Sequence, residues 1–212
     1  MTPKEYVAAR KEEIKELVSK MERVPSLTIV QLNEDAASNA YVKGKLKDAE
    51  FLGVNARLLK LPVETSEAEL LKVIDDLNHD DSVDGFIVQM PLPNGIDEEK
   101  VKLAVAPSKD VDGFHPLSEL FPCTPKGIMN YLHHENVEIK GKNAVVLGRS
   151  NIVGKPMGRL LLAEHCNVTT LHSRTTPEDM AWYIAHADII VIAIGKAGFL
   201  SSKFTYKPTA TI

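Results

Sequence analysis

The chain has 212 residues, with 25 Lys and Arg against 29 Asp and Glu, which gives a formal net charge of −4 at pH 7. This small negative charge argues against a nucleic-acid-binding protein, which usually carries a basic surface. No apolar segment approaches membrane-spanning length, and two cysteines are too few for a disulfide scaffold. We therefore expect a globular, cytoplasmic protein of one large or two small domains.

The first half of the chain predicts helices alternating with strands, from capping patterns and apolar periodicity. Ser38 is expected to cap the second helix, on which Tyr41 and Lys45 share one face because they lie four residues apart. Gln89 stands at the end of an apolar run, where a buried amide needs a partner or contacts a ligand. The expected helices cover about 3–22, 39–52, 66–77 and 97–105, and the expected strands cover 27–32, 57–61 and 85–90.

Residues 106–122 show no regular pattern and include Asp110 and Asp112, two residues apart. A calcium loop would need a third ligand before Gly113 and a later Glu, and the sequence has neither, so we expect no metal site. Loops of this length in compact domains are usually functional. We therefore expect an Asp of this loop to face a substrate.

The second half opens with a predicted strand at 143–147, which runs into a turn bounded by Gly148 and Gly154 and then into a helix. A strand, a glycine-bounded turn and a helix present backbone N–H groups and the positive end of the helix dipole to a phosphate. Ser150 replaces the second glycine of the usual dinucleotide pattern, so the spacing alone leaves an ordinary turn as an equal alternative. Helices are further expected at 124–134 and 176–186, and strands at 167–171, 189–193 and 209–212.

The strand at 167–171 ends in His172-Ser173-Arg174, without a carboxylate. Units that bind NAD place an acidic residue there, on the ribose 2′-OH. Arg149 in the turn adds a second guanidinium, and arginine forks match phosphate geometry. This pattern favours NADP over NAD, although either arginine alone could be a solvated surface charge.

The alternation of helices and strands predicts an α/β fold with parallel sheets and right-handed crossovers. Residues 135–141 link two halves, so we place the domains at 1–136 and 137–212, the second being a Rossmann-type sheet. Cys123, just before the helix at 124–134, is expected to be a small buried thiol.

Five short motifs occur along the chain: YVKGK at 41–45, VQMPLP at 88–93, KDVDG at 109–113, PCTPKG at 122–127 and GRSNIVGKPM at 148–157. In this order they resemble the methylenetetrahydrofolate dehydrogenase/cyclohydrolase family. The resemblance implies two α/β domains with a cleft between them, with folate on the N-terminal side and a nicotinamide cofactor on the C-terminal domain. It also implies a homodimer formed through the cofactor domain.

The family oxidises 5,10-methylenetetrahydrofolate to the methenyl form with NADP, and then hydrolyses that cation to 10-formyltetrahydrofolate. By resemblance, Tyr41 stacks on the folate, Asp112 bonds the pterin, and Lys45 is the acid/base group that Gln89 holds. A lysine amine needs desolvation or nearby cations before it can act as a base. The cofactor-binding residues implied are Gly148, Arg149, Ser150, Gly154, His172, Ser173 and Arg174.

Family members carry a further segment before Met1 and continue past Ile212, so the C-terminal domain is expected to be incomplete. This leaves two alternatives: an NAD-using or dehydrogenase-only relative, and a non-catalytic fragment that binds a ligand or a partner. Lys45 with Gln89 argues against loss of the hydrolase, and the missing acidic residue argues against NAD.

Overall fold

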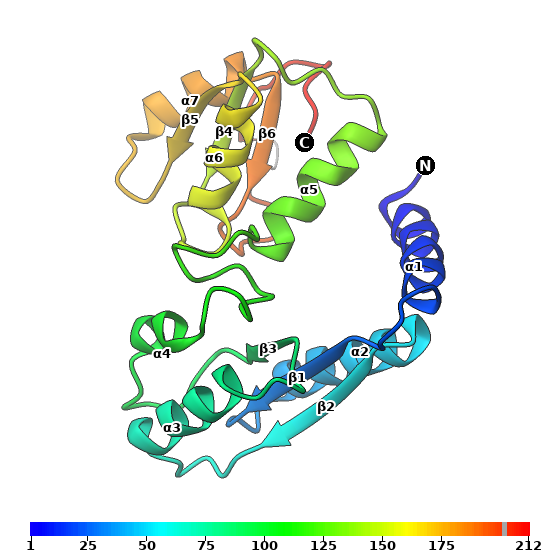
Figure 1. Ribbon diagram of the computed structural model, residues 1–212. Coiled ribbons are helices and arrows are strands. Elements are labelled where there is room, and N and C mark those ends of the chain that lie inside the picture. Colours follow the sequence, from blue (N-terminus) through cyan, green and yellow to red (C-terminus); the bar gives the residue numbers. More distant parts are fainter. Residues whose placement is uncertain (201–202) are drawn as a thin grey trace. The chain divides into compact units, whose positions relative to one another are not determined.

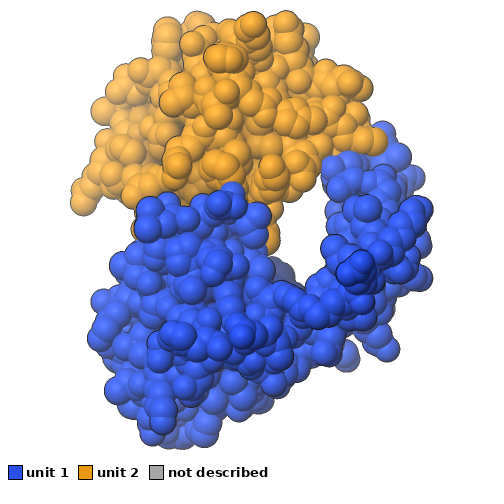
Figure 2. All heavy atoms as spheres, viewed as in Figure 1, with its two compact units in different colours: residues 1–120 blue, residues 121–212 orange. Residues whose placement is uncertain are grey.

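A computed structural model of the chain describes residues 1–200 and 203–212, which form two compact units. The first unit is Met1–Leu120 and the second is Phe121–Ile212, coloured separately in Figure 2. Each unit contains a three-stranded parallel sheet with helices packed on it, which confirms the predicted α/β class (Figure 1). Within the described ranges, no helix is long and apolar enough to cross a membrane.

The sheet of the first unit has the strand order β2-β1-β3, with every pair parallel. Capping boxes start two of its helices, at Thr2 with Glu5 and at Ser66 with Glu69, where the sequence predicted them. The elements in chain order are α1 (Pro3–Ser19), β1 (Ser26–Gln31), α2 (Ala36–Leu52), β2 (Asn55–Lys60), α3 (Glu67–Asn78), β3 (Gly85–Val88) and α4 (Glu98–Ala104).

Helices cover both faces of this sheet. Val30, Phe86 and Val88 point to one face of the sheet, since alternate residues of a strand share a face. Helices α3 and α4 pack on this face. Ile29 and Ile87 pair with each other and point to the opposite face, where α2 lies (Figure 1). Burial on both faces explains why the central part of β1 and the whole of β3 are nearly continuous apolar runs, whereas the edge strand β2 is largely exposed.

The second unit repeats this layered arrangement with the strand order β5-β4-β6. Helices α5 and α6 pack on one face of the sheet, against Ala144 and Val146, and α7 packs on the other, against Val145 and Leu147. The last residues form a bridge from Thr211 to Ile189, where the sequence predicted the start of a strand. The elements are α5 (Cys123–His134), β4 (Asn143–Leu147), α6 (Gly154–Ala163), β5 (Asn167–Leu171), α7 (Pro177–His186) and β6 (Ile189–Ile192).

Helix α2 begins earlier than the sequence predicted. Its N-cap is Asp35, whose carboxylate accepts the Ser38 N–H at 2.8 Å, so the prediction that Ser38 is the cap is wrong. Both residue types cap well, and the upstream one adds a turn to the helix. Ser38 is instead buried inside the helix, where its hydroxyl donates to the Met90 carbonyl at 3.3 Å.

Helix α5 belongs to the second unit. Its residues Met129 and Leu132 are buried in the same cluster as α6, so the two units divide after Leu120, whereas the sequence placed the division after residue 136. Cys123 is the first residue of α5 and is exposed, so the expectation of a buried thiol is wrong.

Candidate functional site

In the first unit, Lys45 and Gln89 meet at the carboxyl end of β3. The Lys45 Nζ donates to Gln89 Oε1 at 3.1 Å, across a separation of 44 residues in the sequence. The Gln89 Nε2 donates to the Met90 carbonyl at 2.8 Å, which turns the amide oxygen toward Lys45. The structure therefore brings together two of the predicted site residues, with the lysine facing a neutral acceptor.

Asp112 belongs to the same site. Burial raises the pKa of its carboxyl, while the Lys45 ammonium opposes that rise and the Asp110 carboxylate adds to it. Asp112 is thus close enough to Lys45 for the two charges to interact, and it is only partly exposed. A partly desolvated carboxylate is a strong acceptor for ligand N–H groups.

A second lysine, Lys102, lines a cavity of about 20 Å³ together with Asp112 and Phe114. Its Nζ pairs with the Glu99 carboxylate at 2.8 Å, and its side chain is 12% exposed. Lys102 is therefore compensated by an anion, whereas Lys45 contacts a neutral amide. The cavity itself holds no more than one water, so a larger ligand has to bind at the surface around it.

Tyr41 lies one helical turn before Lys45 on α2, and 69% of it is exposed. Its ring is not packed in the core of the first unit. A flat aromatic face left open in this way can stack on a planar ligand.

In the second unit, the turn after β4 is closed so tightly that only glycine fits at its ends. Gly148 has a φ of 117°, and its N–H donates to the Leu171 carbonyl at the end of β5, at 2.8 Å. A Cβ on Gly154 would lie 2.2 Å from the Gly148 carbonyl oxygen. The close approach of the two glycines fixes the start of α6 next to the carboxyl end of the sheet.

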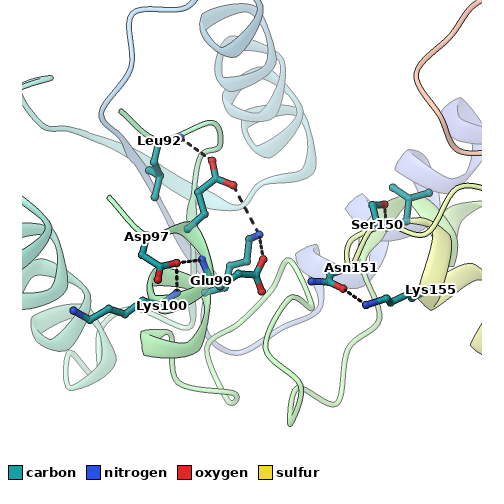
Figure 3. A network of polar contacts seen from close by, with 10 residues as sticks. Leu92, Asp97, Glu99, Lys100, Ser150, Asn151 and Lys155 are labelled. Atoms are coloured by element: carbon teal, nitrogen blue, oxygen red, sulfur yellow. Dashed lines mark hydrogen bonds and ion pairs between the residues drawn. The ribbon is translucent and has the colours of Figure 1, made fainter. Parts of the chain in front are cut away.

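Side chains of the turn form hydrogen bonds within it. The Ser150 hydroxyl accepts the N–H groups of Val153 and Gly154 at 3.1 and 3.3 Å. Lys155 donates to the Asn151 side chain at 2.7 Å (Figure 3). A glycine at position 150 has no side chain that could accept these N–H groups, which explains why this turn departs from the usual dinucleotide pattern.

The predicted phosphate-binding residues converge on one edge of this sheet, because β4 and β5 are parallel neighbours that end side by side at Leu147 and Leu171. The exposed Arg149 follows one strand, and the exposed Ser173 and Arg174 follow the other. Within residues 1–200 and 203–212, neither arginine forms an ion pair with the protein.

The turn after β5 is ordered by its own contacts, since the His172 N–H donates to Thr175 Oγ1 at 3.0 Å and the Arg174 N–H to His172 Nδ1 at 3.2 Å. Two unpaired guanidinium groups, a glycine turn and the absence of a carboxylate after β5 fit a cofactor with a ribose 2′-phosphate. The described residues contain no group of three or more His, Cys, Asp or Glu placed to hold a metal ion.

The sequence did not identify Asp110 as a site residue. Its carboxylate accepts the N–H groups of Gly113 and His115 at 3.0 and 2.8 Å. Asp112 directly precedes this pair of residues in the loop, and Ser118 follows it. An Asp three residues before a Gly is typical of side-chain-stabilised turns, and this was the available signal.

The chain matches one enzyme family over both units. Residues 1–112 match the family described as tetrahydrofolate dehydrogenase/cyclohydrolase, catalytic domain, and residues 122–212 match the NAD(P)-binding domain of the same enzymes. A curated relative, the bifunctional protein FolD of Exiguobacterium sibiricum, is 45% identical over 217 residues, which cover 98% of this chain and 76% of the relative.

Two solved structures show the same fold. The bifunctional enzyme FolD from Campylobacter jejuni superposes with a TM-score of 0.91 at 36% identity, covering 96% of this chain and 76% of that one. The FolD of Trypanosoma brucei, solved with NADP cofactor and an inhibitor, has a TM-score of 0.88 at 31% identity, covering 93% of this chain and 72% of that one.

The tight turn predicts opposite outcomes for two glycines of α6. Gly154→Ala should lower the free energy of unfolding by about 1–3 kcal/mol, because its Cβ has no room beside the Gly148 carbonyl. Gly158→Ala is the matched control: its Cβ would meet the Val168 and Thr170 side chains at ordinary contact distances of 3.6 and 3.9 Å, and it should gain about 0.5–1 kcal/mol of helix propensity. Urea unfolding of both variants checks this, and equal losses would contradict it.

The raised pKa of Asp112 predicts a pH-dependent gain from Asp112→Asn. A carboxyl with a raised pKa binds its proton more tightly in the folded state, so its contribution is most favourable below about pH 4 and is lost as pH rises through the folded pKa. At pH 7 the variant should therefore be at least as stable as the parent, and this advantage should fade toward pH 4 in thermal unfolding.

Asp188→Asn provides the control with the opposite sign. The Asn143 N–H and the Lys207 ammonium lower the pKa of Asp188, so this variant should lose stability at pH 7 and recover it in acid. If Asp112→Asn loses stability at pH 7 by an amount that does not change with pH, the proposed burial cost of the carboxylate is refuted.

Proposed function

Because the chain belongs to the tetrahydrofolate dehydrogenase/cyclohydrolase family, we propose that it oxidises 5,10-methylenetetrahydrofolate to 5,10-methenyltetrahydrofolate with NADP. It then hydrolyses the methenyl product to 10-formyltetrahydrofolate. The observation that carries this proposal is the hydrogen bond between Lys45 and Gln89 beside Asp112, which places an amine, an amide and a carboxylate in one site.

Three residues of the first unit bind the folate in this proposal. The Asp112 carboxylate accepts hydrogen bonds from the amino group and ring N–H of the pterin. The exposed ring of Tyr41 stacks on the planar part of the ligand. Gln89 holds the Lys45 amine through a neutral oxygen, so that the amine lies beside the one-carbon group without a carboxylate of its own.

The second unit holds the cofactor, which supplies the hydride acceptor when bound. Backbone N–H groups of the turn between Gly148 and Gly154 bind the pyrophosphate at the start of α6. Arg149 and Arg174 bind the 2′-phosphate, with His172 and Ser173 beside them. The contribution of the protein to the oxidation is to bind and orient the folate and the cofactor, since this step needs positioning rather than a proton-transfer group.

The hydrolysis needs proton transfer as well as positioning. Water attacks the methenyl carbon and loses a proton to the Lys45 amine. The hydroxyl left on that carbon then loses its own proton as the formyl C=O bond forms and the bond from the carbon to N5 of the folate breaks. One proton is returned to N5 as the ring opens, and one is released for each methenyl cation hydrolysed. Asp112 is engaged by the pterin, Gln89 does not titrate, and Lys102 is paired with Glu99, which leaves Lys45 for this role.

We also propose that the protein acts in the cytoplasm as a homodimer assembled through the second unit, as the family resemblance implies. Light scattering of the purified protein measures the assembly directly, and a monomer at micromolar concentration would contradict it.

Arg149→Ala should weaken NADP binding and leave NAD binding nearly unchanged. Loss of a charge-assisted contact to the 2′-phosphate costs about 1.5–3 kcal/mol, which corresponds to about tenfold or more in Kd. Arg159→Ala is the control, because this exposed arginine lies on α6 over the Phe121 ring rather than in the turn. Calorimetric titration with both cofactors checks the prediction, and an equal loss for NADP and NAD would count against it.

Lys45→Met should slow hydrolysis of the methenyl compound by about 10²–10⁴-fold and retain folate binding and part of the dehydrogenase activity. Methionine keeps the bulk of the side chain and removes the amine, and a positioned acid or base contributes about 10²–10⁴-fold to such a step. Methenyltetrahydrofolate should therefore accumulate in a spectrophotometric assay with NADP.

The matched control is Lys43→Met, an exposed lysine on another face of α2, which should behave as the parent. Hydrolysis at the parent rate in Lys45→Met would refute the assignment. Loss of folate binding together with both activities would make Lys45 a binding residue.

A further inference from the structure

The loop that presents Asp112 is organised by a buried carboxylate. Asp110 is 5% exposed, and its two oxygens accept the backbone N–H groups of Gly113 and His115 at 3.0 and 2.8 Å. Its own carbonyl accepts the Ser118 hydroxyl at 3.3 Å. These three bonds fold the chain around Asp110, and Asp112 lies within the segment that they close, next to Gly113 with its φ of 69°.

The stretch leading into this loop is fixed to the sheet. The Phe86 N–H donates to the Lys109 carbonyl at 3.1 Å, and Asp110 forms a parallel bridge with Phe86. Lys109 donates to the Leu77 carbonyl at 3.0 Å, which ties the loop to the end of α3. Asp112 therefore follows an anchored segment, and the bonds to Asp110 are what set its direction.

The side-chain bonds of Asp110 are the two that it accepts from backbone N–H groups of its own loop. Among residues 1–200 and 203–212, no Lys, Arg or His forms an ion pair with it, and its bonds are to neutral groups. An ionised carboxylate accepts two N–H groups at once, whereas the amide of an Asn would accept only one and present a donor to the other. The need to accept both N–H groups therefore explains why position 110 carries an Asp rather than an Asn.

We propose that Asp110 is a positioning residue that holds the Asp112 loop in the conformation that binds the pterin. Asp110 does not touch the folate: its oxygens are used by backbone N–H groups, and it acts through Asp112. This inference rests on the proposed function, because it gives Asp112 a substrate to bind.

The test is a double-mutant cycle on the full chain with Asp110→Asn, Asp112→Asn and the double variant. Dehydrogenase assays give kcat and KM for methylenetetrahydrofolate and KM for NADP. Asp110→Asn should raise the folate KM by about tenfold, with kcat and the NADP KM close to those of the parent. In the Asp112→Asn background the same change should add nothing further, because residues that act as one unit are not additive.

Three outcomes would overturn the inference. A further tenfold loss in the double variant would mean that Asp110 acts independently of Asp112. A parallel rise in the folate and NADP KM values, with a lower melting temperature, would mean a structural role only. A folate KM at the parent value in Asp112→Asn would refute the role of Asp112 itself, and this result is distinct from a failure of Asp110 alone.

Ser118→Ala keeps the test available if Asp110→Asn does not fold. It removes one bond to the Asp110 backbone and leaves both carboxylates in place. The folate KM should rise by a smaller factor than in Asp110→Asn, again without effect in the Asp112→Asn background. An unchanged folate KM in Ser118→Ala would count against the inference.

Discussion

The hydrogen bond from Lys45 to Gln89 is the interaction on which the proposed chemistry depends. It joins the middle of α2 to the end of β3, and a second bond, from Ser38 to the Met90 carbonyl, joins the first turn of the same helix to the same segment. The amide of Gln89 is oriented by Met90, so the oxygen that meets the lysine is fixed. The amine is thereby hydrogen-bonded to a neutral oxygen, at a place where its charge still interacts with the Asp112 carboxyl.

In the proposed function, the two units bind the folate and the cofactor by different physical means. The first unit uses side chains that converge from α2, β3 and the loop after α4. The second uses two glycines that approach closely, a serine that accepts two N–H groups of the turn, and exposed arginines that form no ion pair with the described part of the chain. The Ser150 and Asn151 side chains bond to the Val153 N–H and to Lys155, so the turn is braced by contacts within the protein.

The sequence predicted most of the fold because local signals and burial agree. Strands β4 and β5 have the predicted bounds, since apolar β-branched runs between polar turns leave little choice of register. The predicted start of α2 was wrong because Asp35 and Ser38 are both good capping residues and tertiary contacts bury Ser38. The prediction that Cys123 is buried was wrong because its exposure depends on how α5 packs, which the residue type alone does not determine.

The site was predicted only in part. Residue types and motif order pointed to Lys45, Gln89 and Asp112, and the structure places these three together. The role of Asp110 could not be derived from the sequence, because its bonds to Gly113 and His115 depend on the path of an irregular loop. The motif resemblance had already selected Asp112 rather than Asp110 as the residue expected to bind the substrate.

The most direct test of this account is a double-mutant cycle between Lys45 and Gln89, read out as the rate of methenyltetrahydrofolate hydrolysis. Lys45→Met, Gln89→Leu and the double variant are compared at saturating substrate. If the amine and the amide act as one unit, the double variant should be no slower than Lys45→Met alone. Independent, multiplicative losses would contradict the account, because Gln89 would then contribute by some means other than holding the lysine.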